Sequence, residues 1–120
     1  MIRGVRGAVT IEHDDAQLVL QETTHLMQEM IAANHIEPEN VASVIVSTTP
    51  DIVSAFPAKA VRTLENWNYV PVMCMHEMNV PGALPLCIRV LIHVDTDEKQ
   101  KDIRHIYLND AIKLRPDLAK

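Results

Sequence analysis

The stretch PLCIRVLIHV, residues 85–94, has the composition of a β-strand buried on both faces, but Arg89 lies in its middle. Alternation along a strand gives one face Cys87, Arg89, Leu91 and His93, and the other face Ile88, Val90 and Ile92. An arginine guanidinium keeps its proton inside a protein, so it cannot stay dry and unpaired. Arg89 therefore either pairs with an acid from a neighbouring strand or subunit, or lines a pocket for an anionic or polarised ligand.

The segments around this strand show the patterns of two helices and four more strands. We expect strands over 2–11, 41–49, 69–78 and 103–110, a long helix over 14–34 and a short helix over 55–66. Asp14 and Gln17 fit a capping box at the start of the long helix, and Asn34 fits a left-handed stop at its end. Gly4 and Gly7 flank Arg6 in the first strand, and a glycine inside a strand marks either a bulge or a place where something approaches the backbone closely.

This order of elements predicts an α+β fold with a mixed sheet of about five strands. The long helix covers one face of the sheet, and the short helix needs packing against its neighbours to be stable. One helix leaves the other face without a partner, and a homo-oligomer is the simplest way to cover it. We expect a single domain, residues 1–120, whose end at about 111–120 is a turn and a mobile tail.

The composition is that of an ordinary globular protein, with 48% hydrophobic residues, 22% charged residues and a formal net charge of −5. The absence of a Lys/Arg run argues against a nucleic-acid partner. No apolar window is long enough to cross a bilayer and no signal peptide is visible, so we expect a cytoplasmic protein without a membrane partner. Neither the two cysteines nor the six histidines have the spacing of a disulfide framework or a metal site.

Several cations lie at strand or helix positions among apolar residues: Arg6, Lys59, Arg62, Arg89 and Arg115. In an acidic protein this pattern indicates a local anion pocket. Glu77 is the one acid that we place among them, and a simple salt bridge is as good an interpretation as a catalytic role. Cys74 and His76 have no orienting third residue, which argues against nucleophilic catalysis. The set fits a reaction driven by electrostatic preorganisation.

Six motifs, in this order and spacing, resemble the monofunctional, homotrimeric (AroH-class) chorismate mutases: RGVRGA, FPAKAVR, VPVMCMHEM, CIRV, RHIYL and LRPDL. The resemblance runs from about residue 2 to 118. It implies an isomerase that rearranges chorismate to prephenate in aromatic amino acid biosynthesis, the shikimate pathway branch toward phenylalanine and tyrosine, without a cofactor or metal. It also implies a trimer with a barrel-like core and active sites between adjacent subunits.

The resemblance gives five residues catalytic or binding roles. Arg89 would lie beside the ether oxygen of the substrate, whose negative charge develops only in the transition state. Arg6 and Tyr107 would hold a substrate carboxylate. Glu77 and Cys74 would hydrogen-bond the ring hydroxyl and offset the charge of the electron-poor fragment.

The resemblance also implies further contacts around the substrate: Phe56, Val72, Lys59, Arg62, Leu114 and Arg115. Phe56 would form part of the wall, and Lys59 and Arg62 would attract and orient the dianion. Leu114 and Arg115 would close the mouth of the site, on a tail that orders when the substrate binds. Met73 stands where the family leads us to expect a small hydroxyl residue, and NVPGALPL contains more proline than expected.

Two other functions compete with this interpretation. A trimeric imine/enamine deaminase of the YjgF type has a similar subunit and a carboxylate-binding arginine on a core strand, but it does not require both Glu77 and the FPAKAVR block. A regulatory trimer that binds a carboxylate metabolite without converting it is the non-enzymatic alternative. Incubation with chorismate, followed by a search for prephenate, decides between these possibilities.

Overall fold

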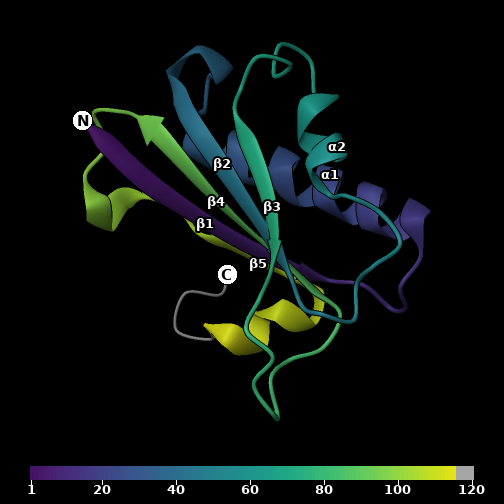
Figure 1. Cartoon of the computed structure of the whole chain (residues 1–120). Helices are drawn as coiled ribbons and strands as arrows, with labels where there is room; N and C mark the ends of the chain where they lie inside the picture. The colour runs from purple at the N-terminus through teal and green to yellow at the C-terminus, as the bar shows by residue number, and fades with distance from the viewer. Residues whose placement is uncertain (116–120) are drawn as a thin grey trace.

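The computed structural model describes residues 1–115 as one sheet with two α-helices on one side (Figure 1). Its strands and helices are β1 (Ile2–Thr10), α1 (Ala16–Asn34), β2 (Val41–Thr48), α2 (Ala58–Arg62), β3 (Val72–His76), β4 (Cys87–Asp95) and β5 (Ile106–Leu108). Short 3₁₀ turns at Pro38–Asn40, Gln100–Asp102 and Asn109–Leu114 complete the chain. The predicted order of strands and helices is confirmed.

The sheet has the strand order β3-β2-β4-β1-β5. Strand β4 pairs antiparallel with both β1 and β2, whereas β1–β5 and β2–β3 are parallel pairs. The expected α+β fold with a mixed five-stranded sheet is therefore confirmed. The strand that carries Arg89 is the central one, which explains why its sequence is so apolar.

Helix α1 covers one face of the sheet through a single apolar stripe. Its buried residues are Val19, Thr23, Leu26, Met27 and Met30. The helix lies so close to β1 that a Cβ atom at Gly7 would collide with Sδ of Met30 and lie 3.0 Å from Cδ1 of Leu26. Of the two interpretations that the sequence left open for its strand glycines, close approach holds at Gly7.

Both ends of α1 differ from the sequence prediction by one residue. Asp15, not Asp14, caps the helix by accepting a hydrogen bond from the N–H of Leu18 at 3.1 Å. Asp14 instead accepts from the N–H groups of Val53 and Ser54, because a loop far away in the sequence lies against it. The left-handed residue is His35, with φ 53°, rather than Asn34.

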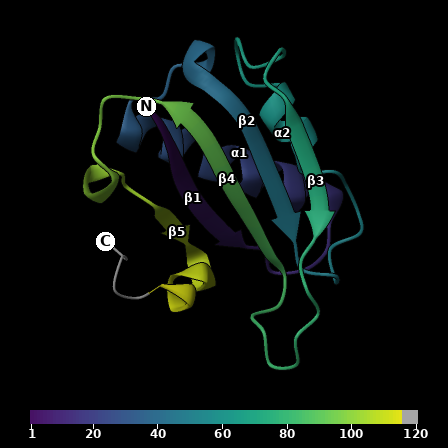
Figure 2. The same cartoon turned by 60° about the vertical axis from the view of Figure 1, so that its left-hand side comes forward.

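The opposite face of the sheet is largely uncovered, as Figure 2 shows for β2 and β4. Along β4, the side chains that face α1 are fully buried at Ile88 and Ile92, whereas Arg89 on the other face is exposed. The expectation that this strand is buried on both faces therefore does not hold for the single chain. Met73 and Met75 of β3 add apolar surface to the open face, with 66% and 45% of their surface exposed.

The 3₁₀ helix η3 (Asn109–Leu114) covers one corner of the open face, next to β5. Its Ala111 is fully buried in a small cluster with Ala8 and Cys87, and Tyr107 and Leu114 pack against the same cluster. The first residues of the expected tail, 111–114, thus form part of this turn, while residues 116–120 lie outside the described part of the chain. Within residues 1–115, no helix has the length and apolar character that a bilayer crossing needs.

Candidate active site

A cavity of about 430 Å³ opens on the uncovered face of the sheet. Its lining includes these predicted site residues: Arg6, Glu77, Arg89, Tyr107, Leu114 and Arg115. They come from β1, β4, β5, the segment after β3 and the end of η3. The fold thus gathers in one place residues that the sequence spreads over more than a hundred positions.

The strand register explains why the cavity forms around Arg89. In the sheet, Arg89 lies between Ala8 of β1 and Ser47 of β2. Residues paired in this way project from the same face, so the long arginine side chain has a small neighbour on each side. Tyr107 of β5 pairs with Ala8 and adds a wall. Small side chains around one long cation leave room for a ligand.

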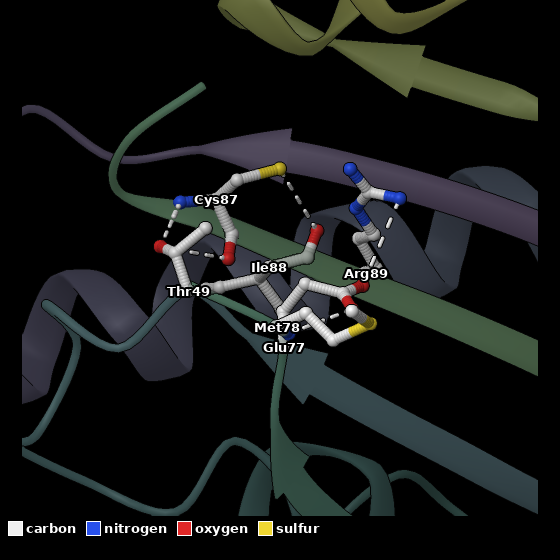
Figure 3. A network of polar contacts seen from close by, with 6 residues as sticks. All are labelled: Thr49, Glu77, Met78, Cys87, Ile88 and Arg89. Carbon is white, nitrogen blue, oxygen red and sulfur yellow. Dashed lines mark hydrogen bonds and ion pairs between the residues drawn. The ribbon is translucent and has the colours of Figure 1, made fainter. Parts of the chain in front are cut away.

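Glu77 approaches Arg89 from the segment after β3 (Figure 3). The distance between Oε2 of Glu77 and Nη1 of Arg89 is 3.8 Å, which is longer than a hydrogen bond. The two side chains are 36% and 45% exposed, so this is a loose pair at the cavity surface. The sequence left two interpretations of Arg89 open, an ion pair with an acid or the lining of a ligand pocket. Each holds in part, because Arg89 has Glu77 as an acidic neighbour and also lines a cavity.

A polar network fixes the start of β4, two residues before Arg89. The hydroxyl of buried Thr49 accepts from the N–H of Cys87 at 3.0 Å (Figure 3). The backbone N–H of Thr49 donates to the carbonyl of Cys87. Asp51 accepts from the hydroxyl of Thr49 at 2.5 Å and from the N–H of Leu86 at 3.0 Å. This network has no signature in the sequence, because STTPD at 47–51 has only the pattern of a strand end.

The remaining predicted residues gather on the other side of β3. Cys74 pairs in register with fully buried Val46, on the face that packs against α1 and α2. Its Sγ accepts a hydrogen bond from the N–H of Ala58, the first residue of α2, at 3.3 Å. Phe56 and Cys74 line a separate cavity of about 440 Å³.

Val72 lies on the same face of β3 as Cys74 and is half-buried against the core. Lys59 and Arg62 are exposed on α2. None of these three residues lines the cavity of Arg89, and neither do Phe56 and Cys74. A single chain therefore holds two groups of predicted site residues, on opposite faces of the sheet.

The family model described as chorismate mutase type I matches residues 2–118 of the chain. The chain belongs to the chorismate mutase type I family. It is 52% identical over 119 residues to chorismate mutase AroH of Bacillus subtilis, an alignment that covers 99% of this chain and 94% of that protein. It is 45% identical over 119 residues to chorismate mutase AroH of Thermus thermophilus, covering 98% of this chain and 97% of that protein.

A solved structure of chorismate mutase from Clostridium thermocellum matches the fold with a TM-score of 0.88 and 43% identity. The match covers 91% of this chain and 96% of that one. The family resemblance drawn from the six motifs is thus confirmed. The alternative of a YjgF-type deaminase finds no support in these matches.

The chemistry of the two thiols follows from their burial in this chorismate mutase fold. Burial raises the pKa of the Cys74 thiol, and the hydrogen bond from Ala58 and the charge of Arg62 oppose the shift. Burial likewise raises the pKa of Cys87, against the effect of the neighbouring Arg89. Both thiols are therefore neutral near pH 7, and Cys74 can act as a weak hydrogen-bond donor. Within residues 1–115, no three His, Cys, Asp or Glu side chains gather in a way that could hold a metal ion.

Proposed function

We propose that this member of the chorismate mutase type I family converts chorismate to prephenate by an intramolecular Claisen rearrangement. In this reaction a carbon–oxygen bond of the ether breaks while a carbon–carbon bond forms within the same molecule, so no proton or electron has to be supplied. The observation that carries the proposal is the placement of Arg89, a permanent cation on the central strand that lines a cavity open to a ligand.

Arg89 would act on the charge that the reaction creates. The ether oxygen gains negative charge as its bond breaks, and a guanidinium held in place beside it stabilises the transition state more than the substrate. Glu77 supports this role because, at 3.8 Å, it leaves the donors of Arg89 able to turn to a ligand. Its carboxylate would also offset the positive charge that remains on the ring fragment.

The two carboxylates of chorismate would be held by the cations around the same cavity. Arg6 and Tyr107 lie on β1 and β5 at its wall, and Arg115 lies at its edge after η3. Leu114 would limit the entry of water at the mouth. Such positioning groups also select the compact conformer in which the two reacting carbons are close.

The second group of residues would reach the substrate from a neighbouring copy of the chain. Val72 and Cys74 cannot turn into the cavity of Arg89 within one subunit, because alternation along β3 points both to the other face. The lining of that cavity does not include Phe56, Lys59 or Arg62 either. We therefore propose a homotrimer in which each site combines both groups across a subunit boundary. A monomer would bind chorismate poorly and would not convert it.

The open face of the sheet supports an assembly of this kind. Ile45 and Leu91 are half-buried there, and Met73 and Met75 are exposed. Packing these faces around a common axis would bury the apolar surface in a barrel-like core. In that arrangement Met73, which replaces the small hydroxyl residue expected from the family, would sit near the subunit boundary.

Three further expectations remain proposals. The chain would work as a single domain, residues 1–120. Both cysteines are free, which fits a reducing compartment such as the cytoplasm. No nucleic acid or membrane would take part.

The direct test is to incubate the purified protein with chorismate and to measure prephenate. Turnover that saturates with chorismate supports the proposed function. Tight binding of chorismate without prephenate would instead support a regulatory trimer that recognises carboxylate metabolites.

A further inference from the structure

A histidine side chain fixes the backbone of Arg6 from the β5 side of the sheet. The N–H of Arg6 donates to Nδ1 of His105 at 2.9 Å. The β1–β5 ladder itself joins Gly7–Val9 to Ile106–Leu108, so His105 extends the pairing by one position. The two residues are 99 positions apart, and only the fold brings them together.

Asn34 at the end of α1 anchors the backbone of Arg104, the residue that precedes His105. The side-chain amide of Asn34 donates to the carbonyl of Arg104 and accepts from its N–H, both at 2.8 Å. It also donates to the carbonyl of Met30 at 2.9 Å, which ties it to the helix. Because Met30 is fully buried, a rigid part of the core fixes the residue that precedes His105.

The contact with Arg6 requires a neutral imidazole. A backbone N–H only donates, so Nδ1 must carry a lone pair and the ring proton must lie on Nε2. Burial, and then the charges of Arg6 and Arg115, lower the pKa of His105 below its ordinary value. Protonation would remove the acceptor and place a third positive charge beside two guanidinium groups.

We propose that His105 is a positioning residue for Arg6: its neutral Nδ1 fixes the strand backbone from which Arg6 reaches a substrate carboxylate, and Asn34 anchors the backbone of Arg104, the residue before His105. This inference rests on the proposed function, because it takes the carboxylate contact of Arg6 from there. A carboxylate keeps its charge throughout the rearrangement. Loosening Arg6 should therefore weaken substrate and transition state alike, which raises KM and leaves kcat nearly unchanged.

Two substitutions separate the acceptor from the ring. His105→Asn keeps an acceptor oxygen near the position of Nδ1, whereas His105→Leu has a similar branch without an acceptor. For the leucine variant we expect KM for chorismate to rise about three- to tenfold, with kcat within about twofold of wild type. The asparagine variant should stay within about twofold of wild type in both constants.

His13→Leu is the matched control, because His13 is exposed and lines neither the cavity of Arg89 nor that of Cys74. It should leave KM and kcat unchanged. A leucine variant at position 105 with the KM of wild type would overturn the proposal. Equal losses in the leucine and asparagine variants would overturn it as well, since they would show that only the ring matters.

NMR of the wild-type protein tests the contact without turnover, and it serves even if the leucine variant does not fold. We expect an unprotonated Nδ1 in His105 and a scalar coupling between this atom and the amide nitrogen of Arg6. A proton on Nδ1, or no coupling, overturns the role of His105 while normal conversion of chorismate leaves the proposed function intact. Conversely, a wild-type protein that shows the coupling but makes no prephenate removes the proposed function, and the role of Arg6 with it.

Discussion

The Cys74 thiol and the Arg89 guanidinium project from opposite faces of the same sheet. Cys74 of β3 pairs with buried Val46, and Arg89 of β4 pairs with the next residue of β2, Ser47. Adjacent residues of a strand point to opposite faces, so the two side chains cannot meet within one chain. If both contact the substrate, as the family resemblance implies, a site must combine parts of two subunits.

Trimers that mix two inactive variants, one altered in each group of site residues, should therefore regain activity that neither variant has alone. One variant carries Arg89→Ala, and the other carries Lys59→Glu with Arg62→Glu, which repels the dianion. Each alone should be nearly inactive. In trimers co-expressed from equal amounts of both, random assembly leaves about a quarter of the sites intact, so prephenate formation should return to about a quarter of the wild-type rate. No recovery in trimers shown to be mixed would place both groups in one subunit's site.

Thr49→Val should destabilise the fold and disturb Arg89 at the same time. The substitution leaves the buried N–H of Cys87 without its side-chain acceptor and removes one of the two donors to Asp51. We expect a loss of about 1–3 kcal/mol in the free energy of unfolding, measured with denaturant, and a lower kcat. Thr24→Val removes only a hydroxyl contact within α1, to the carbonyl of Leu20, and should cost about 0.5 kcal/mol or less. Equal effects of the two substitutions would show that the network at β4 is unimportant.

Gly7→Ala tests the close approach of α1 to the sheet. An added Cβ would collide with Met30, a fully buried side chain, so we expect the free energy of unfolding to fall by about 1–3 kcal/mol. Gly4→Ala is the control in the same strand, because its Cβ would lie 3.4 Å from Cδ1 of Leu91, in ordinary contact. In thermal unfolding, the Tm of Gly7→Ala should be clearly lower than that of Gly4→Ala. A Gly7→Ala protein as stable as Gly4→Ala would mean that the helix can move away at little cost.

The pH dependence of stability should contain a contribution from His105. Its pKa in the folded chain lies below the ordinary value of 6.5, so over this interval the unfolded chain binds the proton more readily. The contribution is fully favourable above pH 6.5, falls as the pH drops toward the folded pKa, and is constant below it. His105→Asn removes this titration, so its Tm should fall less than that of wild type between about pH 7 and about pH 5. An equal or steeper fall in the variant would contradict the neutral ring.

Local pattern was enough to predict the order of the elements and the open face of the sheet, because alternation and helical spacing follow burial directly. The caps of α1 were misplaced by one residue, since a loop at Val53 and Ser54 takes Asp14 away from the helix. Such contacts depend on the fold and leave no local signal.

The family motifs were enough to predict the residues of the candidate site. They did not predict that these residues are divided between the two faces of the sheet. The alternation along β3 contains that information, yet it becomes useful only once the register with β2 is known. The partners that fix the site were missed for a similar reason. Thr49 holds Cys87, 38 positions away, and His105 holds a backbone group 99 positions away, so neither sequence position shows a motif.

Replacement of Arg89 by citrulline, which keeps the shape of the side chain and removes its charge, tests the central claim most directly. With a permanent cation acting on a charge that develops only during the reaction, kcat should fall about a hundred- to thousandfold or more, while KM changes far less. A citrulline protein that turns over chorismate at nearly the wild-type kcat, or that loses only substrate affinity, would contradict the account.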